Sequence, residues 1–593
     1  MDILGFRDGQ EEIINEILKG RDVLGIMPTG AGKSICYQVP AMMLDGVTIV
    51  ISPLISLMKD QVDSLNENGI PACFINSSLS ENEIAQTFQN IAYGMYQIIY
   101  IAPERLESGS FTGLLKNLKV AMVAIDEAHC VSQWGHDFRP SYRMIKEVID
   151  SFAKRPVVAS FTATATSIVK DDIIQLLGLD NPYTLITGFD RKNLYFSVQN
   201  QTKKFDFIVN YLEKHRSDSG IIYCGTRKTV DSLYEKLSAD GFLVSKYHAG
   251  MSEKDRTKAQ DDFIFEKTDI MIATNAFGMG IDKSNVRFVI HYNMPQDLES
   301  YYQEAGRAGR DGDHAECILL FSRSDILTNK FLISRSSDLD HTNAYQKLNE
   351  IVDYCNTSKC LRKYILEYFG EKPKFKSCHF CSNCNSSLET TDITQDAQKI
   401  LSCVKRTHER FGTGIVTDVL KGADTSRIRE LGFDKLSTYG IMKEYSKETI
   451  KDLIAFLVAE EYLETRGTEY PTLCLNEQSN EILFHDKQIV INRKIEKQDK
   501  KEKAIKNSKV LDNQDFNSEL FEILRKLRKE LATEENVPPF VIFADTSLKQ
   551  MAALYPKTLE EFLQISGVGE FKSEKYGKKF LEVINEFLRK RAS

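Results

Sequence analysis

The stretch Asp126-Glu-Ala-His-Cys-Val-Ser-Gln-Trp-Gly-His-Asp-Phe-Arg-Pro140 joins two acidic residues to a polar, aromatic loop. Just upstream, the unbroken apolar run from Val120 to Ile125 has the pattern of a strand that is buried on both faces. If this strand belongs to a parallel sheet, its end places two carboxylates at the edge where such folds bind ligands. Asp126 can then hold Mg²⁺ through water, and Glu127 can orient or deprotonate an attacking water. Asp-Glu also follows ordinary strands, so this motif needs support from elsewhere in the chain.

The loop after these carboxylates contains Trp134, the only tryptophan among the 593 residues. A lone tryptophan is usually a core residue, and apolar neighbours would favour that interpretation. The neighbours here are mostly polar, and include Gln133, His136, Phe138 and Arg139. This setting favours a ring that stacks on a nucleic-acid base.

A second motif supplies a loop that can bind phosphate. Residues 22–27 are strand-like, and Pro28-Thr-Gly-Ala-Gly-Lys-Ser34 leads into a helix-like segment. Its glycines let backbone N–H groups turn toward phosphate oxygens, and the helix N-terminus adds partial positive charge. Lys33 would reach the β- and γ-phosphates, and Ser34 would bind Mg²⁺. The general pattern has glycine in place of Met27, but the acidic strand end downstream makes nucleotide binding the favoured interpretation.

The length and composition of the chain limit the class of protein in which these motifs occur. At about 150 residues per domain, a chain of this length predicts roughly four domains. No apolar run approaches the ~18 residues that span a bilayer, and the first residues do not resemble a signal peptide, which predicts a cytoplasmic protein. The net charge of −8 and pI near 5.8 do not indicate nucleic-acid binding, so that function must depend on local basic patches.

Apolar strand-like runs alternate with helical periodicity up to about residue 325, which is the pattern of an α/β protein with parallel sheets. Small, polar or proline residues follow the runs, so we expect the run ends to share a binding edge. The first series of runs covers residues 47–51, 97–101 and 157–161, and the second covers residues 220–224, 246–250 and 270–274.

The segment Gln303-Glu-Ala-Gly-Arg-Ala-Gly-Arg-Asp-Gly312 follows the second series. Its two arginines, Arg307 and Arg310, are three residues apart and are expected on one helix face. Arginine suits developing phosphoryl charge, although an exposed pair is more often solvated surface. The neighbouring glycines favour the functional interpretation, because glycine is a poor choice for a plain surface helix.

The order of these motifs resembles superfamily 2 helicases, and specifically the RecQ family of DNA helicases, across essentially the whole chain. Phe6-Arg7-Asp8-Gly9-Gln10 resembles the family's adenine-reading segment, with Gln10 as the base contact. The stretch Met27-Pro-Thr-Gly-Ala-Gly-Lys-Ser34, in which Met27 replaces the first glycine of the general pattern, is similar to the family's own phosphate loop. The residues that the resemblance assigns to that loop are Thr29, Gly30, Ala31, Gly32, Lys33 and Ser34.

The same resemblance covers the hydrolysis motif and the arginine segment. Asp126-Glu-Ala-His129 and the loop with Trp134, Phe138 and Arg139 are similar to the family's hydrolysis motif and the aromatic loop that couples DNA to hydrolysis. The segment at 303–312 is similar to the motif that carries the arginine finger. Arg310 is our first choice for that role and Arg307 the second.

Cysteine spacing predicts a metal site. Cys378, Cys381 and Cys384 are separated by two-residue gaps, and four thiolates at such spacing form a closed tetrahedral zinc site. Cys360 and Cys355 are the candidates for the fourth ligand, and His379, an accidental cluster or a disulfide are further alternatives. We prefer Cys360, because Lys359-Cys-Leu-Arg-Lys-Tyr364 resembles the RecQ helix that supplies this ligand.

The C-terminal third is assigned mainly from the resemblance. Strand-like segments at 461–465 and 470–475 flank a turn at 466–469, which resembles the wing of the family's winged-helix domain. Residues 487–509 contain nine Lys/Arg and three Asp/Glu and are expected to form a solvated linker. Residues 512–593 are similar to a helicase-and-RNase-D C-terminal (HRDC) domain. Its near-neutral charge does not favour strong DNA binding. The basic residues expected to touch DNA are Lys572, Lys575, Lys578 and Lys579.

The expected fold is α/β, with two tandem RecA-like parallel-sheet domains followed by a helical zinc-binding domain, a winged-helix domain and a small helical HRDC-like domain. The expected boundaries are 1–187, 188–335, 336–390, 391–486, a basic linker at 487–511, and 512–593.

The resemblance implies an ATP-dependent, Mg²⁺-requiring and zinc-containing DNA helicase that moves 3′ to 5′. Its expected substrates are single-stranded and forked duplex DNA in recombination, repair and replication, and it is expected to act as a monomer. Single-strand-binding protein and other repair proteins are candidate partners. The alternatives are an RNA helicase, a non-unwinding translocase on the same motor, and a nucleic-acid-binding scaffold with an inactive nucleotide site. Intact Lys33, Glu127 and Arg310 argue against the scaffold.

Overall fold

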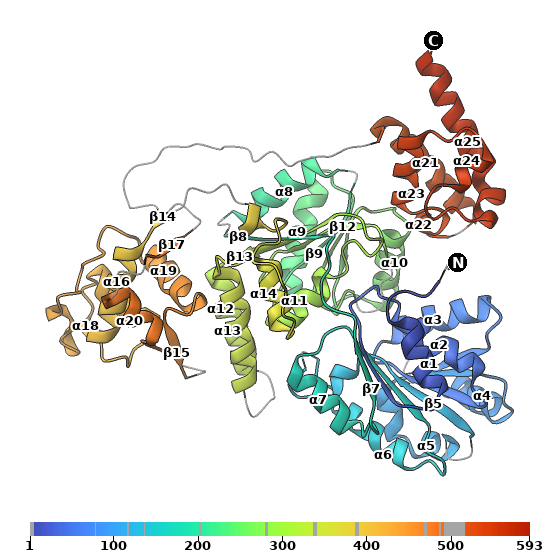
Figure 1. Cartoon of the computed structure of the whole chain (residues 1–593), viewed down its shortest axis with the longest axis horizontal. Coiled ribbons are helices and arrows are strands. Elements are labelled where there is room, and N and C mark those ends of the chain that lie inside the picture. The colour runs from blue at the N-terminus through green and yellow to red at the C-terminus, as the bar shows by residue number, and fades with distance from the viewer. Residues whose placement is uncertain are drawn as a thin grey trace.

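A computed structural model shows two stacked α/β lobes, a helical region beside them, and two further domains at opposite sides (Figure 1). The structure describes residues 5–76, 79–115, 118–135, 137–200, 203–216, 218–278, 283–335, 341–385, 391–467, 471–484, 488–491, 516–535 and 537–592. His136, residues 468–470 of the predicted wing and residues 492–511 of the predicted linker lie outside these ranges.

The first lobe is built on a seven-stranded sheet in which every pair of neighbouring strands is parallel, in the order β3-β4-β2-β5-β6-β1-β7. Strands β1 to β6 are largely buried because helices cover both faces, which is why they read as apolar runs, whereas the edge strand β7 is partly exposed. The strands are β1 (Val23–Ile26), β2 (Val47–Ile51), β3 (Ala72–Ile75), β4 (Ile98–Ile101), β5 (Val120–Ile125), β6 (Val157–Thr162) and β7 (Tyr183–Ile186). The helices are α1 (Gln10–Leu18), α2 (Lys33–Met43), α3 (Ile55–Glu67), α4 (Glu81–Ala92), α5 (Gly109–Leu115), α6 (Met144–Asp150) and α7 (Ser167–Leu176).

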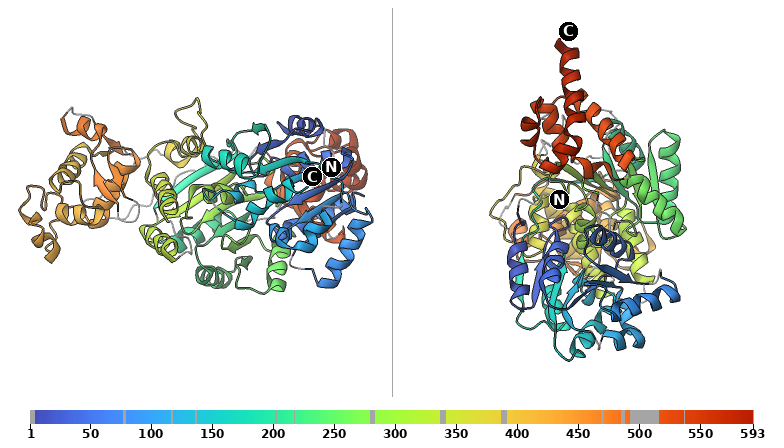
Figure 2. Two further views of the ribbon diagram at one scale, coloured as in Figure 1. Left: turned by 90° about the horizontal axis from the view of Figure 1, so that it is seen from below. Right: turned by 90° about the vertical axis from the view of Figure 1, so that its right-hand side faces the viewer.

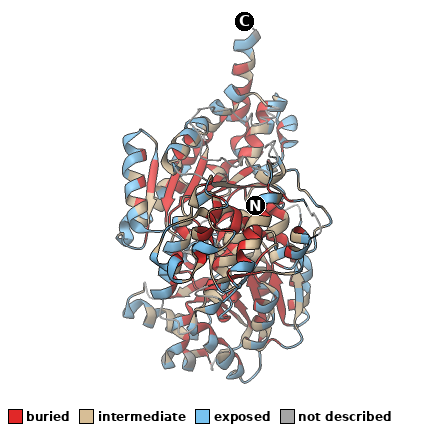
Figure 3. Ribbon diagram, turned by 90° about the vertical axis from the view of Figure 1, so that its left-hand side faces the viewer, coloured by how far each residue is buried: buried red, intermediate tan, exposed pale blue. Residues whose placement is uncertain are grey.

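The second lobe repeats this design with a six-stranded parallel sheet in the order β10-β11-β9-β12-β13-β8. Figure 3 shows the strands of the lobes as buried ribbons inside a shell of partly exposed helices. The strands are β8 (Leu194–Asn200), β9 (Ser219–Tyr223), β10 (Val244–Tyr247), β11 (Ile270–Ala273), β12 (Val286–His291) and β13 (Ala315–Phe321). The helices are α8 (Lys204–Lys214), α9 (Arg227–Ala239), α10 (Glu253–Ile264), α11 (Leu298–Ala305) and α12 (Arg323–Arg335).

The arginine segment departs from the sequence prediction. Helix α11 ends at Ala305, so Arg307 and Arg310 lie in the turn that follows and do not share a helix face. The two glycines explain the difference. Gly306 caps the helix, and Gly309 has a φ of +54°, a left-handed conformation that glycine adopts easily and that interrupts a helix.

Beyond the second lobe lie a short helical domain and a winged-helix domain, which projects away from the rest of the molecule (Figures 1 and 2). The predicted hairpin forms as the antiparallel pair β15–β16, and β14 pairs with β17, which extends this domain past the expected boundary at 486. The helices of the short domain are α13 (Thr342–Asn356), α14 (Leu361–Tyr368) and α15 (Ser382–Asn385). The elements of the winged-helix domain are β14 (Thr391–Asp392), α16 (Thr394–Arg406), α17 (Thr413–Lys421), α18 (Ser426–Glu430), α19 (Lys447–Ala459), β15 (Glu464–Arg466), β16 (Thr472–Cys474), α20 (Glu477–Phe484) and β17 (Val490–Ile491).

The C-terminal helical domain has its own apolar core and packs against the second lobe. In the ranges given above, no helix is both long and apolar enough to cross a membrane. Its helices are α21 (Ser518–Glu535), α22 (Pro539–Ile542), α23 (Asp545–Leu554), α24 (Leu559–Leu563) and α25 (Glu570–Ala592).

A buried network of charges joins this domain to the second lobe. Arg528, whose side chain is fully buried, donates to Asp545 Oδ1 at 2.7 Å and lies 3.6 Å from Glu266 Oε1 of the second lobe. Glu266 also pairs with the buried Lys283 at 3.5 Å and accepts from Asn285 Nδ2 at 2.9 Å. Because buried charges are tolerated only when they are paired, the second lobe and the C-terminal domain depend on each other at this contact.

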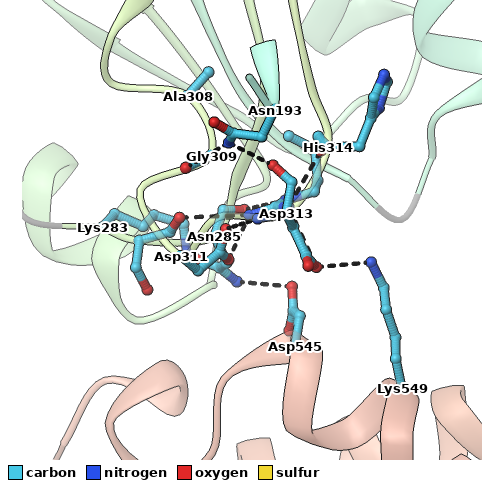
Figure 4. A network of polar contacts seen from close by, with 12 residues as sticks. Asn193, Lys283, Asn285, Ala308, Gly309, Asp311, Asp313, His314, Asp545 and Lys549 are labelled. Carbon is cyan, nitrogen blue, oxygen red and sulfur yellow. Dashed lines mark hydrogen bonds and ion pairs between the residues drawn. The ribbon is translucent and has the colours of Figure 1, made fainter. Parts of the chain in front are cut away.

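The edge of the same contact is drawn in Figure 4. Asn285 Nδ2 lies 3.4 Å from Asp545 Oδ2, and Lys549 Nζ lies 2.9 Å from Asp313 Oδ2. Burial acts to raise the pKa of Asp545, but Arg528 and Arg287 hold it at about 2. Asp545 is therefore charged at neutral pH, and the interface keeps its ion pairs there.

We expect Glu266→Gln to loosen this docking, because it removes the carboxylate that pairs with the buried Lys283 and lies beside Arg528. Losing one member of a buried pair costs about 3–5 kcal/mol. Hydrogen exchange should then rise across residues 283–287 and in α21. Glu235→Gln, on the exposed surface of the same lobe, is the matched control. Unchanged exchange in Glu266→Gln would show that apolar packing, not this charge network, holds the domain in place.

Candidate functional site

A cavity of about 850 Å³ lies between the two lobes. It is formed where the carboxyl ends of the first sheet face the turn after α11, the place at which parallel α/β folds bind ligands. The predicted site residues that line it are Arg7, Gln10, Thr29, Gly30, Gly32, Lys33, Ser34, Asp126, Glu127, Arg307 and Arg310. The volume and the mixed polar lining fit a bound nucleotide.

The phosphate loop has the expected backbone conformation. Gly30 and Gly32 have φ values of +86° and +81°, and a side chain at Gly32 would place its Cβ 2.4 Å from Gln10 Nε2. Helix α2 begins at Lys33, so its free N–H groups point toward the cavity. Lys33 Nζ donates to the carbonyl of Met27 at 3.2 Å and thus crosses the mouth of the loop.

The segment before α1 folds onto this loop. Gln10 Nε2 donates to the carbonyls of Ala31 and Gly32 at 3.0 and 3.1 Å, and its Oε1 accepts from Arg7 N at 2.9 Å. The Arg7 guanidinium donates to the Gly30 carbonyl. Phe6 is 46% exposed and is not among the residues that line the cavity, so the structure does not bring it to the site with Arg7 and Gln10.

The two carboxylates follow β5 as predicted. Glu127 has a φ of +47°, a strained conformation for a non-glycine residue, and its N–H donates to Asp126 Oδ1 at 3.0 Å. Glu127 Oε2 lies 3.3 Å from His129 Nδ1, which in turn lies 2.9 Å from Thr162 Oγ1. Burial, and next the charge of Glu127, raises the pKa of Asp126 to about 7, while Lys33 acts in the opposite direction. A bound Mg²⁺ would favour the charged form of this buried carboxyl.

The arginines approach the phosphate loop from the second lobe. The Arg310 side chain lies over Gly30, where a Cβ would be 3.5 Å from Arg310 Cγ. Arg307 is 6% exposed, and its guanidinium donates to the carbonyl of Gly278. Of the two, Arg310 is the one that the structure places against the phosphate loop.

Arg191 is a functional candidate that the motif analysis missed. Its guanidinium donates to the carbonyl of Thr29 in the phosphate loop at 3.1 Å and to three carbonyls of the arginine turn. These three acceptors are Gly306, Ala308 and Gly309, at 3.2, 3.0 and 2.9 Å. No sequence signal marks this role, because all four partners are backbone atoms and would be the same in any sequence.

The aromatic loop follows the acidic pair and lies at the surface. Trp134 is 43% exposed, so the interpretation that it is a core residue is not supported. Phe138 is partly buried under the guanidinium of Arg143, whose Cζ is 5.1 Å from the ring centroid. Arg139 Nε donates to Asp137 at 3.2 Å, and its Nη1 donates to the Pro53 carbonyl at 3.3 Å. The loop is thus braced on one side and offers the indole to solvent.

The four cysteines predicted from spacing come together. The Sγ atoms of Cys360, Cys378, Cys381 and Cys384 all lie within 4.8 Å of one another, a separation that suits one tetrahedral metal ion. Cys355 is buried in α13 and, among the described residues, neither it nor His379 belongs to the cluster. Asn383 Nδ2 donates to the carbonyls of Thr357 and Lys359, which holds the segment with Cys360 beside the other three thiols.

Five family models together match most of this chain. Each match falls on one of the structural units described above and supports the predicted succession of domains. The matches are to the DEAD/DEAH box helicase (residues 7–172), the helicase conserved C-terminal domain (203–312), the RecQ zinc-binding domain (323–385), the RQC domain (387–501) and the HRDC domain (517–584). Fold and site together therefore define a two-lobed, nucleotide-hydrolysing helicase motor with a zinc-binding domain.

Similar proteins specify the family. A protein of Bacillus subtilis (strain 168), named ATP-dependent DNA helicase RecQ, is 46% identical over 586 residues and covers 98% of this chain and 97% of its own length. A protein of the same name from Haemophilus influenzae is 40% identical, covering 98% and 94%. The ATP-dependent helicase SGS1 of Saccharomyces cerevisiae is 40% identical over 483 residues, covering 77% and 33%. The chain belongs to the RecQ family, which confirms the predicted family.

We expect one zinc ion per chain, held by the four clustered thiolates. Replacing Cys381 by serine should abolish zinc binding and make the domain sensitive to protease, because metal binding and local folding are coupled. Elemental analysis and limited proteolysis measure both effects. Cys355→Ser is the matched control, since it alters a buried thiol outside the cluster. Zinc retained in Cys381→Ser, or lost in Cys355→Ser, would contradict this ligand set.

Proposed function

We propose that the chain is an ATP-dependent DNA helicase that moves 3′ to 5′ and unwinds duplex and branched DNA in recombination, repair and replication. One observation carries the proposal. In a member of the RecQ family, a single interlobe cavity brings together the phosphate loop, the Asp126–Glu127 pair and the arginine turn. Parts contributed by both lobes allow ATP binding to close the cleft and hydrolysis to open it, which is the motion that moves a motor along a strand.

We assign the site residues these roles in ATP hydrolysis. The backbone from Thr29 to Gly32 and the side chain of Lys33 cradle the phosphates. Ser34 and Asp126 hold Mg²⁺, and this assignment is supported by their shared place in the cavity lining. Gln10 reads the adenine, which its place in the cavity lining supports, and both Gln10 and Arg7 bond carbonyls of the phosphate loop.

Glu127 and Arg310 act at the reacting phosphate. Glu127 takes a proton from the attacking water, and its contact with His129 supports this role because it orients the carboxylate. Arg310 stabilises the charge that develops on the transferred phosphoryl group, as its place over Gly30 favours. Arg307 donates to the Gly278 carbonyl and helps to hold the turn that carries Arg310.

We assign DNA coupling to the aromatic loop. Trp134 and Phe138 stack on the bases, and Arg139 braces the loop, which follows the acidic motif at Asp126–His129. Through this short connection, strand binding can alter the position of Glu127. The zinc-binding, RQC and HRDC domains favour DNA over RNA, and the ratio of ATPase stimulation by DNA and RNA tests that choice.

A forked duplex with a single 3′ or a single 5′ tail tests the direction of unwinding. Unwinding only from the 3′ tail is the expected result. Equal unwinding from both tails would contradict the proposed polarity, and ATP turnover without strand separation would indicate a non-unwinding translocase. Sedimentation of the DNA-bound protein tests whether it acts as a monomer. Co-precipitation tests whether single-strand-binding protein and other repair proteins are its partners in the cytoplasm.

We expect Glu127→Gln to lower DNA-stimulated ATP turnover by about 10²–10⁴-fold, the usual contribution of a general base. ATP binding should persist, because the base acts on water and not on the nucleotide. Steady-state turnover and equilibrium binding of a labelled ATP analogue measure the two effects. Glu147→Gln, exposed on α6, is the control. Turnover close to that of the unchanged protein would reject Glu127 as the base.

We expect Trp134→Ala and Phe138→Ala each to reduce DNA stimulation of ATPase sharply while single-strand binding falls modestly. One stacked base contributes about 1–3 kcal/mol, whereas backbone phosphates supply most of the affinity. Titrations of ATPase and of binding with single-stranded DNA separate the effects. Tyr93→Ala removes a ring that is 82% exposed in the same lobe and is the control. Full stimulation in both loop variants would exclude the loop from coupling.

A further inference from the structure

Lys347 of α13 contacts both lobes of the motor at once. Its Nζ donates to the carbonyl of Trp134, in the aromatic loop of the first lobe, at 2.6 Å. The same atom lies 2.9 Å from Glu299 Oε1 of α11 in the second lobe. The Lys347 side chain is 13% exposed and that of Glu299 only 4%, so this ion pair is largely shielded from water.

On the side of the second lobe, Glu299 lies on the helix that precedes the residues lining the nucleotide cavity. Glu299 lies in the first turn of α11, one helical turn before Gln303, and Arg307 lies in the turn that follows the end of the helix at Ala305. Both Gln303 and Arg307 line the nucleotide cavity. A short helix is rigid over this distance, so a displacement at Glu299 is transmitted to the arginine turn.

On the side of the first lobe, the Trp134 carbonyl belongs to a backbone segment that follows the hydrolysis motif. Trp134 N donates to Ser132 Oγ at 3.0 Å, and Cys130 N donates to the Glu127 carbonyl at 2.9 Å. Tyr142, beyond the loop, donates its hydroxyl to the Asp126 carbonyl at 2.9 Å. The backbone that Lys347 holds is therefore continuous with the backbone of both carboxylates.

We propose that Lys347 is a positioning residue that couples the place of the aromatic loop to the place of the arginine turn. The inference rests on the proposed function, because it assumes that DNA acts through the loop. An ammonium group has several donors and can bond the Trp134 carbonyl and the Glu299 carboxylate together. When DNA moves the loop, the shared cation moves relative to Glu299, and α11 follows.

Asn343 offers an internal comparison on the same helix. Its Nδ2 donates to the Gln133 carbonyl at 3.3 Å, so it contacts the aromatic loop, whereas the ion pair with Glu299 belongs to Lys347. Lys363 offers a second comparison. It lies in α14 of the same zinc-binding domain, and its amino group lies 3.5 Å from Glu367 within that helix.

The test compares Lys347→Met with Lys347→Arg, Asn343→Ala and Lys363→Met in the full-length, zinc-loaded protein. Methionine keeps most of the apolar stem and removes the charge, whereas arginine keeps the charge. Zinc content and thermal unfolding establish that each variant is folded. Glu299→Gln removes the same ion pair from the other side and serves if Lys347→Met does not fold.

Two readouts report coupling and not simple stability. The first is ATPase activity titrated with single-stranded DNA, which separates the maximal stimulated rate from the DNA concentration that gives half of it. The second is the fluorescence of Trp134, which is the only tryptophan of the chain and sits on the loop itself. It is titrated with a non-hydrolysable ATP analogue in the absence of DNA.

We expect Lys347→Met to lower the maximal DNA-stimulated rate about tenfold, within the usual range of coupling between two sites. The half-stimulating DNA concentration should change little, since phosphate contacts supply most of the affinity. The fluorescence response to nucleotide should be lost, because the link from the arginine turn to Trp134 is gone. Lys347→Arg should restore part of both signals, Asn343→Ala should reduce them less, and Lys363→Met should leave them unchanged.

Normal stimulation and a normal fluorescence response in Lys347→Met would overturn the inference. Equal losses in Lys347→Met and Lys363→Met would overturn it as well, since they would indicate a general effect on the domain. These outcomes differ from a failure of the proposed function. In that case the unchanged protein itself would show no stimulation of ATPase by DNA.

Discussion

The guanidinium of Arg191 is the contact on which the geometry of the interlobe site depends. It bonds the Thr29 carbonyl of the phosphate loop and the carbonyls of Gly306, Ala308 and Gly309 in the arginine turn. Burial lowers the pKa of Arg191 from its ordinary value, but a guanidinium remains charged in proteins. One rigid, planar cation thus satisfies the irregular turn and sets its distance from the loop that faces the phosphates.

Local strain and irregularity occur on both sides of this contact. In the first lobe, Glu127 adopts a left-handed conformation, which costs about 1–3 kcal/mol and persists only where the surroundings hold it. The contact with His129 and the bond from Cys130 N to the Glu127 carbonyl provide that support. In the second lobe, α11 ends at Ala305, and Gly309 adopts a left-handed conformation between Arg307 and Arg310. Each lobe therefore presents its reacting group from a backbone conformation that a regular helix or strand does not provide.

The contrast between what could and could not be predicted has a physical basis. The central strands and the phosphate loop were predictable because burial on two faces and φ values above zero leave local marks, such as the run from Val120 to Ile125 and the two loop glycines. Three members of the thiol cluster were predictable from spacing, whereas the choice of Cys360 over Cys355 came from the resemblance to the RecQ helix. The arginines were wrongly expected on one helix face, because the breaking effect of Gly306 and Gly309 depends on how the turn packs. Arg191 escaped notice because its partners are carbonyls, which no side-chain pattern records.

Contacts between residues far apart in the sequence explain why the docking of the C-terminal domain was not predicted. The net charge of the C-terminal domain is near zero, and this balance conceals a buried set of opposite charges around Arg528 and Asp545. The basic residues that were expected to touch DNA are in part engaged inside the domain. Lys575 pairs with Glu535 at 2.7 Å, and Lys572 donates to the Val541 carbonyl at 2.8 Å. DNA contact by this domain stays a prediction, whereas its docking on the second lobe is a feature of the structure.

Three domains contact α11 and the turns on either side of Arg310. The first lobe reaches the turn through Thr29 and Arg191, and the zinc-binding domain reaches α11 through Lys347. The C-terminal domain reaches the far end through Lys549, which pairs with Asp313 just after Arg310 (Figure 4). Because a buried ion pair or bonded turn shifts between discrete arrangements and does not deform smoothly, each contact can bias where the arginines stand. The proposed role of Lys347 would thereby connect the aromatic loop and the docked C-terminal domain to the same segment of the second lobe.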